Sequence, residues 1–243
     1  MKPTLKIFDT SEFLATAMAQ EFFSILSKIL DKKPHVSVVL SGGSTPTLFF
    51  QELVKISDQF NHWDKILFFW GDERCVPPDH SDSNYGVARK ILLEKVPVPE
   101  HHIYRIQGEN DPLQEANRYA LKIREALQVQ KNCYPEFDWI FLGLGEDGHT
   151  ASLFPGSDLL KVSDQICGVA QHPGSGQLRI TLTLPVLNQA RRITFLVSGQ
   201  SKSKVVSEII RGTEGTEKYP AALVEPRKGI LEWILDKSAS VLI

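Results

Sequence analysis

The sequence predicts a single α/β domain built on a mostly parallel sheet. Short apolar runs typical of buried strands alternate with segments of helical periodicity along the whole chain. Several of these apolar runs end in glycine or polar residues, at the point where α/β proteins place their ligand sites. The 243 residues contain no repeat, low-complexity tract or linker-like stretch, so we expect one domain over residues 1–243.

The composition is that of an ordinary globular protein, with 42% hydrophobic and 23% charged residues. The formal charge of -2 argues against partners such as nucleic acid or an anionic membrane, because both need a basic surface. The three cysteines, Cys75, Cys133 and Cys167, form no Cys-x-x-Cys pair, which favours a reducing compartment such as the cytoplasm. We also expect no signal peptide and no membrane-spanning helix, because the N-terminus lacks an apolar segment and no run of about 18 apolar residues occurs.

The elements follow one another in a regular order. Residues 5–8 form a short strand, and apolar positions from Phe13 to Ile29 recur at intervals of three and four, as in a helix with one buried face. Asp9 and Glu12 resemble a capping box at its start. Further strands are predicted at 35–40, 65–70, 103–106, 137–142, 166–170, 179–184 and 192–198. Further helices are predicted at 46–56, 85–93, 113–127, 185–190 and 205–210, with closing elements at 220–224 and 231–236.

A glycine turn follows the strand at residues 35–40. Gly42 and Gly43 precede Ser44 and Thr45, and Pro46 fits the first position of a helix with Thr45 as its cap. Free backbone N–H groups and the positive end of a helix attract phosphate, and glycines let it approach closely. The turn lacks the lysine of a Walker loop, so the choice is between a small phosphate site and a plain tight turn.

Charged residues follow the strand at residues 65–70. Asp72, Glu73 and Arg74 should therefore lie on the ligand-facing rim of the sheet. They could form an internal set of salt bridges, which is the favoured interpretation for Glu73. The guanidinium of Arg74 is better suited to a phosphate, a carboxylate or a developing oxyanion. Lys202 begins another strand-to-helix turn, where it is either a phosphate ligand or an exposed lysine.

The segment after the strand at residues 137–142 combines an acid and an imidazole. Asp147 and His149 stand on either side of Gly148, just beyond the predicted carboxyl end of that strand. The short tripeptide is compatible with a catalytic pair or with a turn in which the two side chains merely bond to each other. No histidine or cysteine spacing in the chain matches a set of metal ligands, so no metal site is predicted.

Several segments together resemble the family of 6-phosphogluconolactonases and glucosamine-6-phosphate deaminases. The matching segments are Leu40–Pro46, Trp70–Pro77, Ser83–Tyr85, Gly143–Pro155 and Arg179–Thr183. The resemblance implies a three-layer α/β/α Rossmann-like fold shared with glucosamine-6-phosphate deaminase and ribose-5-phosphate isomerase. It also implies hydrolysis of 6-phospho-D-glucono-1,5-lactone to 6-phospho-D-gluconate in the oxidative pentose phosphate pathway, without a cofactor or metal.

The residues fit this chemistry. His149 is the candidate general base, Asp147 would orient its imidazole or stabilise the charged form, and Arg74 would polarise the lactone or hold its oxygens. Asp72 and Asn84 would orient sugar hydroxyls or support Arg74. Gly43, Ser44 and Thr45 would hold the 6-phosphate at the helix start, helped by Lys202 and Arg179. The full set assigned to the substrate and its phosphate is Gly42, Gly43, Ser44, Thr45, Asp72, Asn84, Arg179 and Lys202. A monomer or a homodimer is expected.

Two other functions compete with this interpretation. The deaminases carry a glutamate shortly after the histidine and Asp-Glu-Tyr in the earlier motif. This chain has Phe154 and Asp72-Glu73-Arg74 instead, and both differences favour a lactonase. A non-catalytic phosphosugar sensor would usually carry a helix-turn-helix, whereas this chain begins directly with a strand and has no basic DNA-reading segment.

Overall fold

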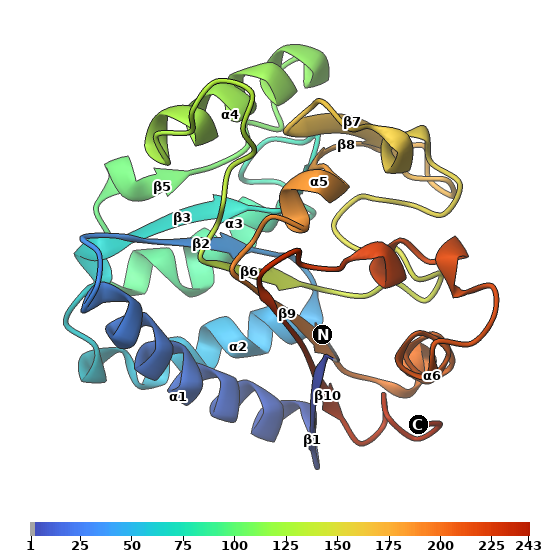
Figure 1. Ribbon diagram of the computed structural model, residues 1–243. Helices are drawn as coiled ribbons and strands as arrows, with labels where there is room; N and C mark the ends of the chain where they lie inside the picture. Colours follow the sequence, from blue (N-terminus) through green and yellow to red (C-terminus); the bar gives the residue numbers. More distant parts are fainter. Residues whose placement is uncertain (1–2) are drawn as a thin grey trace.

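The computed structural model describes residues 3–243 and contains a seven-stranded sheet with every pairing parallel (Figure 1). The strand order is β1-β10-β9-β6-β2-β3-β5. The strands are β1 (Thr4–Phe8), β2 (Val36–Leu40), β3 (Ile66–Trp70), β5 (Ile103–Tyr104), β6 (Trp139–Leu142), β9 (Arg192–Val197) and β10 (Ile230–Asp236). This arrangement confirms the predicted α/β class with a mostly parallel sheet.

Helices connect these strands and cover both faces of the sheet. They are α1 (Ser11–Leu30), α2 (Ser44–Lys55), α3 (Asn84–Ile91), α4 (Pro112–Ala126), α5 (Leu184–Leu187) and α6 (Ser203–Arg211). The chain moves toward β5 through α1, α2 and α3 and then back toward β10 through α4, α5 and α6. Right-handed crossovers therefore place the two sets on opposite faces. Figure 1 shows α1 and α2 on one side and α4 on the other.

Short 3₁₀ helices occupy several of the connections. They are η1 (Ser57–Gln59), η2 (Trp63–Lys65), η3 (Leu93–Lys95), η4 (Glu100–His102), η5 (Asp158–Lys161), η6 (Gln200–Lys202), η7 (Thr216–Lys218) and η8 (Pro220–Leu223). Because η2 leads directly into β3, this strand begins one residue later than the sequence predicts. The strand β5 follows η4 and begins at the predicted residue 103, but it ends at Tyr104 instead of residue 106.

A second, antiparallel sheet lies beside α4 and differs from the sequence prediction. It contains β4 (Asp72–Arg74), β8 (Leu178–Leu182) and β7 (Cys167–Gln171), in the order β4-β8-β7. Residues 72–74 were expected on the ligand-facing rim with no strand of their own, and nothing in the sequence indicated that the strands near 166–170 and 179–184 form a separate sheet. Only antiparallel strands can be joined by a connection as short as the one between β7 and β8, whereas parallel neighbours need a crossover.

The core lies between the main sheet and its helices. All residues of β2, β3 and β6 are buried, which accounts for their unbroken apolar character. By length and mean hydropathy alone, α1 could cross a membrane, and among residues 3–243 it is alone in this. Its apolar face nevertheless packs in the core. The buried residues of this face are Leu14, Ala15, Met18, Ala19, Phe22, Phe23 and Leu26.

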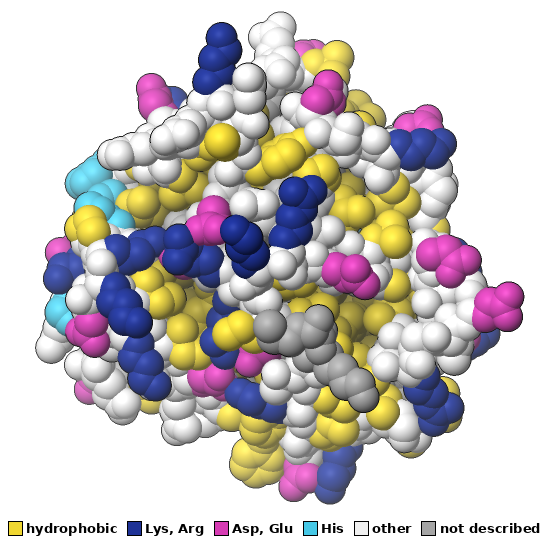
Figure 2. Space-filling view, viewed as in Figure 1, with side chains coloured by type: hydrophobic (Ala, Val, Ile, Leu, Met, Phe, Trp, Pro, Cys, Tyr) yellow, Lys and Arg dark blue, Asp and Glu magenta, His cyan; other side chains and the backbone are white. Residues whose placement is uncertain are grey.

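The start of α1 differs from the predicted capping box. The cap is Thr10, not Asp9, and its hydroxyl accepts a hydrogen bond from the N–H of Phe13. A threonine satisfies the same free donor as an aspartate, so the local sequence allowed either residue. The surface seen in Figure 2 carries basic and acidic side chains side by side, as the small net charge of the chain predicts.

Candidate active site

The cavity that holds the predicted site residues lies where the strand order reverses, at the carboxyl ends of β2 and β6. From β2 the chain continues toward β5, and from β6 it continues toward β9, so the two connections diverge and leave a crevice. The cavity holds about 240 Å³. The predicted site residues that line it are Gly42, Gly43, Ser44, Thr45, Asp72, Arg74, Asn84, His149, Arg179 and Lys202. Asp147 lies behind His149 and is not part of this lining.

One end of the cavity is the N-terminus of α2. The helix begins at Ser44 with Gly43 as its cap residue, which corrects the predicted cap at Thr45. Gly43 has φ of 108°, a backbone conformation that glycine adopts without strain. Within residues 3–243, no side chain caps this helix end. Its first N–H groups are therefore available to a ligand, and the helix dipole favours an anion.

Two further groups support this end of the cavity. The hydroxyl of Thr45 lies 2.7 Å from that of Ser198, which joins α2 to the end of β9. The ammonium of Lys202 lies 3.7 Å from Glu146 and is partly exposed, so it can turn to a phosphate. We refer to Gly43, Ser44, Thr45 and Lys202 as the phosphate end.

The predicted pair of Asp147 and His149 is formed. The Nδ1 of His149 lies 2.6 Å from Oδ1 of Asp147, and the backbone N–H of His149 donates to the same oxygen at 3.1 Å. A carboxylate partner assigns the ring proton to Nδ1, which leaves Nε2 unprotonated and able to accept a proton. The ring lines the cavity, with about a quarter of the side chain (26%) exposed.

The turn around this pair is tightly packed. A Cβ at Gly145 would lie 2.0 Å from Nδ1 of His149, so only glycine leaves room for the ring. On the other side, the ring of Tyr219 packs against Gly148, and the N–H of Ala221 donates to the Gly148 carbonyl. Burial raises the pKa of Asp147, but the hydrogen bonds from the His149 backbone and ring outweigh it and lower the pKa overall.

Arg74 and Arg179 stand opposite each other in the register of β4 and β8. Both line the cavity, and the Nε of each is buried without a hydrogen-bond partner in the described residues. Nη1 of Arg74 donates to the carbonyl of Asp82 at 2.7 Å. Burial, and secondarily the charge of Arg74, lower the pKa of Arg179. Two adjacent guanidinium groups with free donors form a strong receptor for an anionic oxygen.

Asp72 and Asn84 lie beside this arginine pair. Asp72 is buried and accepts a hydrogen bond from the hydroxyl of Ser152 at 2.6 Å. The Nδ2 of Asn84 donates to the backbone carbonyl of Asp72 at 3.0 Å, and its Oδ1 lies so close to Gly42 that a Cβ there would be 1.8 Å away. The two ends of the cavity therefore meet at Gly42. We refer to Asp72, Arg74, Asn84, His149 and Arg179 as the reaction end.

An aromatic wall closes the reaction end. The buried ring of Phe154 lies 4.9 Å from the ring of His149 and 5.7 Å below the guanidinium of Arg179. The ring of His172 packs on Phe154 at 5.2 Å. Residue 154 was singled out as the place where the related deaminases carry a glutamate. Here it offers His149 an apolar contact and no second carboxylate.

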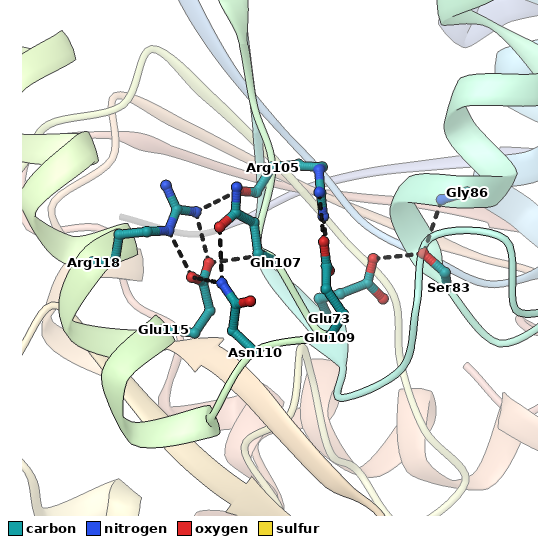
Figure 3. Close-up of polar contacts among 9 residues, drawn as sticks. All are labelled: Glu73, Ser83, Gly86, Arg105, Gln107, Glu109, Asn110, Glu115 and Arg118. Carbon is teal, nitrogen blue, oxygen red and sulfur yellow. Dashed lines mark hydrogen bonds and ion pairs between the residues drawn. The ribbon is translucent and has the colours of Figure 1, made fainter.

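Glu73 behaves differently from the sequence prediction. It was expected to join an internal set of salt bridges, but it forms no ion pair in the described residues and instead accepts hydrogen bonds from backbone N–H groups. The reason is that β4 turns its side chain away from Arg74, since neighbouring strand residues point to opposite faces. Figure 3 shows Glu73 beside Ser83, whose hydroxyl donates to it at 3.1 Å.

Some contacts of the site were not identified from the sequence. Ser152 and Ser198 each bond to a site residue, and Tyr219 packs against Gly148 within the catalytic turn, but the three were given no role. The hydroxyls of Ser152 and Ser198 lie directly beside predicted motifs, so a search for polar neighbours of those motifs could have found them. Tyr219 has no local signal. No group of three or more His, Cys, Asp or Glu residues suited to a metal ion occurs within residues 3–243.

Comparison with known proteins gives a consistent result over nearly the whole chain. A 6-phosphogluconolactonase of Haemophilus influenzae is 42% identical over 238 residues, which are 97% of this chain and 98% of the relative. The human 6-phosphogluconolactonase is 36% identical over 98% of this chain and 93% of its own length.

Solved structures agree with these relatives. The 6-phosphogluconolactonase from Trypanosoma cruzi superposes with a TM-score of 0.86 at 30% identity, covering 99% of this chain and 96% of that one. A monomeric glucosamine-6-phosphate deaminase has a TM-score of 0.81 at 19% identity, covering 99% of this chain and 100% of its own, and shows that the fold is shared. The family model for glucosamine-6-phosphate isomerases/6-phosphogluconolactonase matches residues 9–233. The chain belongs to this family.

Proposed function

We propose that the chain hydrolyses 6-phospho-D-glucono-1,5-lactone to 6-phospho-D-gluconate. One observation carries the proposal: an oriented histidine base, with its Nδ1 held 2.6 Å from Asp147, shares a cavity with an uncapped helix N-terminus. The first can activate water, and the second can bind the phosphate of the same molecule. The names of the relatives described above support the same substrate class.

The reaction follows from the placement of these groups. Nε2 of His149 removes a proton from water, whose oxygen attacks the lactone carbonyl carbon. The negative charge that develops on the carbonyl oxygen is stabilised by Arg74 and Arg179. The ester C–O bond of the ring then breaks, and His149 returns its proton to the departing ring oxygen. Asp147 keeps the imidazole in one tautomer and stabilises its charged form meanwhile.

The substrate is oriented by the two ends of the cavity. The phosphate binds the N–H groups and hydroxyls of Ser44 and Thr45 and the ammonium of Lys202. Asp72 and Asn84 face the sugar hydroxyls or support Arg74. We further propose that the protein acts in the cytoplasm as a monomer or homodimer, which light scattering on a gel-filtration column would distinguish.

The direct test measures hydrolysis of freshly prepared 6-phosphogluconolactone, corrected for spontaneous opening of the ring. The wild-type chain should accelerate the reaction, and release of ammonia from glucosamine 6-phosphate should stay at background. Ammonia release with no acceleration of lactone hydrolysis would replace the lactonase by a deaminase. Binding of 6-phosphogluconate without turnover of either substrate would instead indicate a sensor.

A further inference from the structure

Glu73 is a buried carboxylate inside the Asp72-Glu73-Arg74 motif, yet it does not line the cavity. Its side chain lies on the opposite face of β4 from those of Asp72 and Arg74, and the residue is 1% exposed. A buried ionised group is costly unless every oxygen has a partner. The reaction proposed above gives Glu73 no role, so the burial of its carboxylate needs another explanation.

The contacts of Glu73 join two parts of the reaction end. Oε1 accepts the backbone N–H of Arg74 at 2.8 Å and that of Asn84 at 2.7 Å. Oε2 accepts the backbone N–H of Tyr85 at 2.7 Å and the hydroxyl of Ser83 at 3.1 Å. Asn84 and Tyr85 are the first residues of α3, whose free N–H groups and dipole favour a negative charge. The carboxylate thus connects β4 to the first turn of α3.

The segment from Asp82 to Tyr85 also positions the guanidinium of Arg74 and the amide of Asn84. Asp82, two residues before α3, accepts the hydrogen bond from Nη1 of Arg74. Asn84 is itself the first helical residue and reaches Asp72 and Gly42. A shift of α3 away from β4 would therefore displace the Arg74 guanidinium and the Asn84 amide together.

The hydrogen-bond pattern favours the ionised form. Three of the four partners are backbone N–H groups, which donate and cannot accept. A proton on either oxygen would have only the Ser83 hydroxyl to receive it, and that hydroxyl, which also accepts the N–H of Gly86, would then no longer donate to Glu73 (Figure 3). Burial raises the pKa of Glu73, whereas the N–H groups of Tyr85, Asn84 and Arg74 oppose this rise.

We propose that Glu73 is a positioning residue, whose buried carboxylate fixes Arg74 and Asn84 at the reaction end by joining β4 to α3. The predicted loss of kcat rests on the proposed function, because it is measured on hydrolysis of the lactone. None of the hydrogen bonds to Glu73 reaches the phosphate end, because α2 and Lys202 make none of them. An amide at this position would turn an NH₂ group toward N–H donors and separate the two elements.

The test is Glu73→Gln, with Glu115→Gln as a matched control. Glu115 is also 1% exposed and accepts the N–H of Gln107 at 2.7 Å and two nitrogens of Arg118, but it bonds to no cavity residue (Figure 3). In the folded fraction, we expect kcat of Glu73→Gln to fall about 100-fold, the loss typical of a misplaced catalytic group, with KM within threefold. The control should lose thermal stability but keep kcat within twofold.

The outcomes separate positioning from general support. Equal loss of kcat in both variants, or an unchanged kcat in Glu73→Gln, would overturn the proposal. If Glu73→Gln does not fold, Ser83→Ala removes one of the four contacts, and its kcat should fall severalfold at unchanged KM; an unchanged kcat counts against the proposal. If the wild-type chain shows no hydrolysis, the proposed function fails. In that case, crystal structures of the wild-type chain and of both variants test the positioning proposal without kinetics, because only Glu73→Gln should move Arg74 and Asn84.

Discussion

The two ends of the cavity are built in different ways. The phosphate end consists mainly of backbone: a glycine with φ of 108° and the uncapped first turn of α2, assisted by Lys202. The reaction end consists of side chains from four separate segments, around Arg74, Asn84, His149 and Arg179. Backbone donors are fixed by the fold itself, whereas side chains need neighbours that orient them. Substitutions at the reaction end should therefore change kcat, and those at the phosphate end should change KM.

The largest effect should come from the base. We expect His149→Gln to lower kcat by about 10²–10⁴-fold, the range for loss of a general base, because glutamine cannot accept the proton of water. Affinity for 6-phosphogluconate, measured by calorimetry, should change less than threefold, since the phosphate end is intact. Wild-type turnover in this variant, after correction for spontaneous opening, would remove His149 from the mechanism.

The second largest loss of kcat should come from substitution of Arg74. Arg74→Lys keeps the charge but loses the guanidinium fork and the bond to the Asp82 carbonyl. We expect kcat to fall about 10²-fold, as for loss of one oxyanion donor, with a small change in KM. Arg89→Lys is the control, since Arg89 is exposed and pairs with Glu94 at 2.8 Å. A rise in KM without loss of kcat would assign Arg74 to binding rather than to the reaction.

A smaller loss is expected when the orientation of the base is disturbed. The methyl group of Gly145→Ala would lie 2.0 Å from Nδ1 of His149 and 2.5 Å from Oδ1 of Asp147, so the pair must shift. We expect kcat to fall about tenfold, because the shift needed is smaller than the displacement of about 1 Å that can lower a rate about 100-fold. Gly174→Ala, where the nearest atom is 3.4 Å away, should leave kcat unchanged. Equal kcat in the two variants would show that the pair tolerates displacement.

Substitutions at the phosphate end should change KM rather than kcat. Lys202→Ala removes one cation but leaves the helix N-terminus of α2 in place. We therefore expect KM to rise about tenfold, equivalent to about 1.4 kcal/mol of binding, with kcat within threefold. Lys204→Ala, an exposed lysine two residues farther along, should change neither constant. A loss of kcat in Lys202→Ala would break the division between the two ends.

This division also explains what the sequence could predict. The phosphate end and the pair of Asp147 and His149 are local, so glycine turns and short spacing indicate them. The alignment of Arg74 with Arg179 depends on an antiparallel register between residues 105 positions apart, and only family resemblance pointed to Arg179. Most contacts of Glu73 are likewise outside any local pattern, because Ser83, Asn84 and Tyr85 lie 10 to 12 residues later, in a segment that folds back onto a three-residue strand.

The smallest effect concerns the stability of the catalytic pair itself. The pKa of Asp147 is lowered in the folded chain, so its carboxylate contributes stability above the ordinary pKa of about 3.9 and loses it as the pH falls through the lower folded value. Because the side chain is 45% exposed, Asp147→Asn should lower the free energy of unfolding by less than about 1 kcal/mol. Urea unfolding should show this difference at neutral pH and a shrinking difference below about pH 4. Asp158→Asn, on a side chain that is 96% exposed, serves as the control and should show none. If the difference in unfolding free energy between the wild-type chain and Asp147→Asn instead grew as the pH fell, the ionised carboxylate would destabilise the folded chain. The reaction end would then orient its base at the expense of stability, unlike the phosphate end.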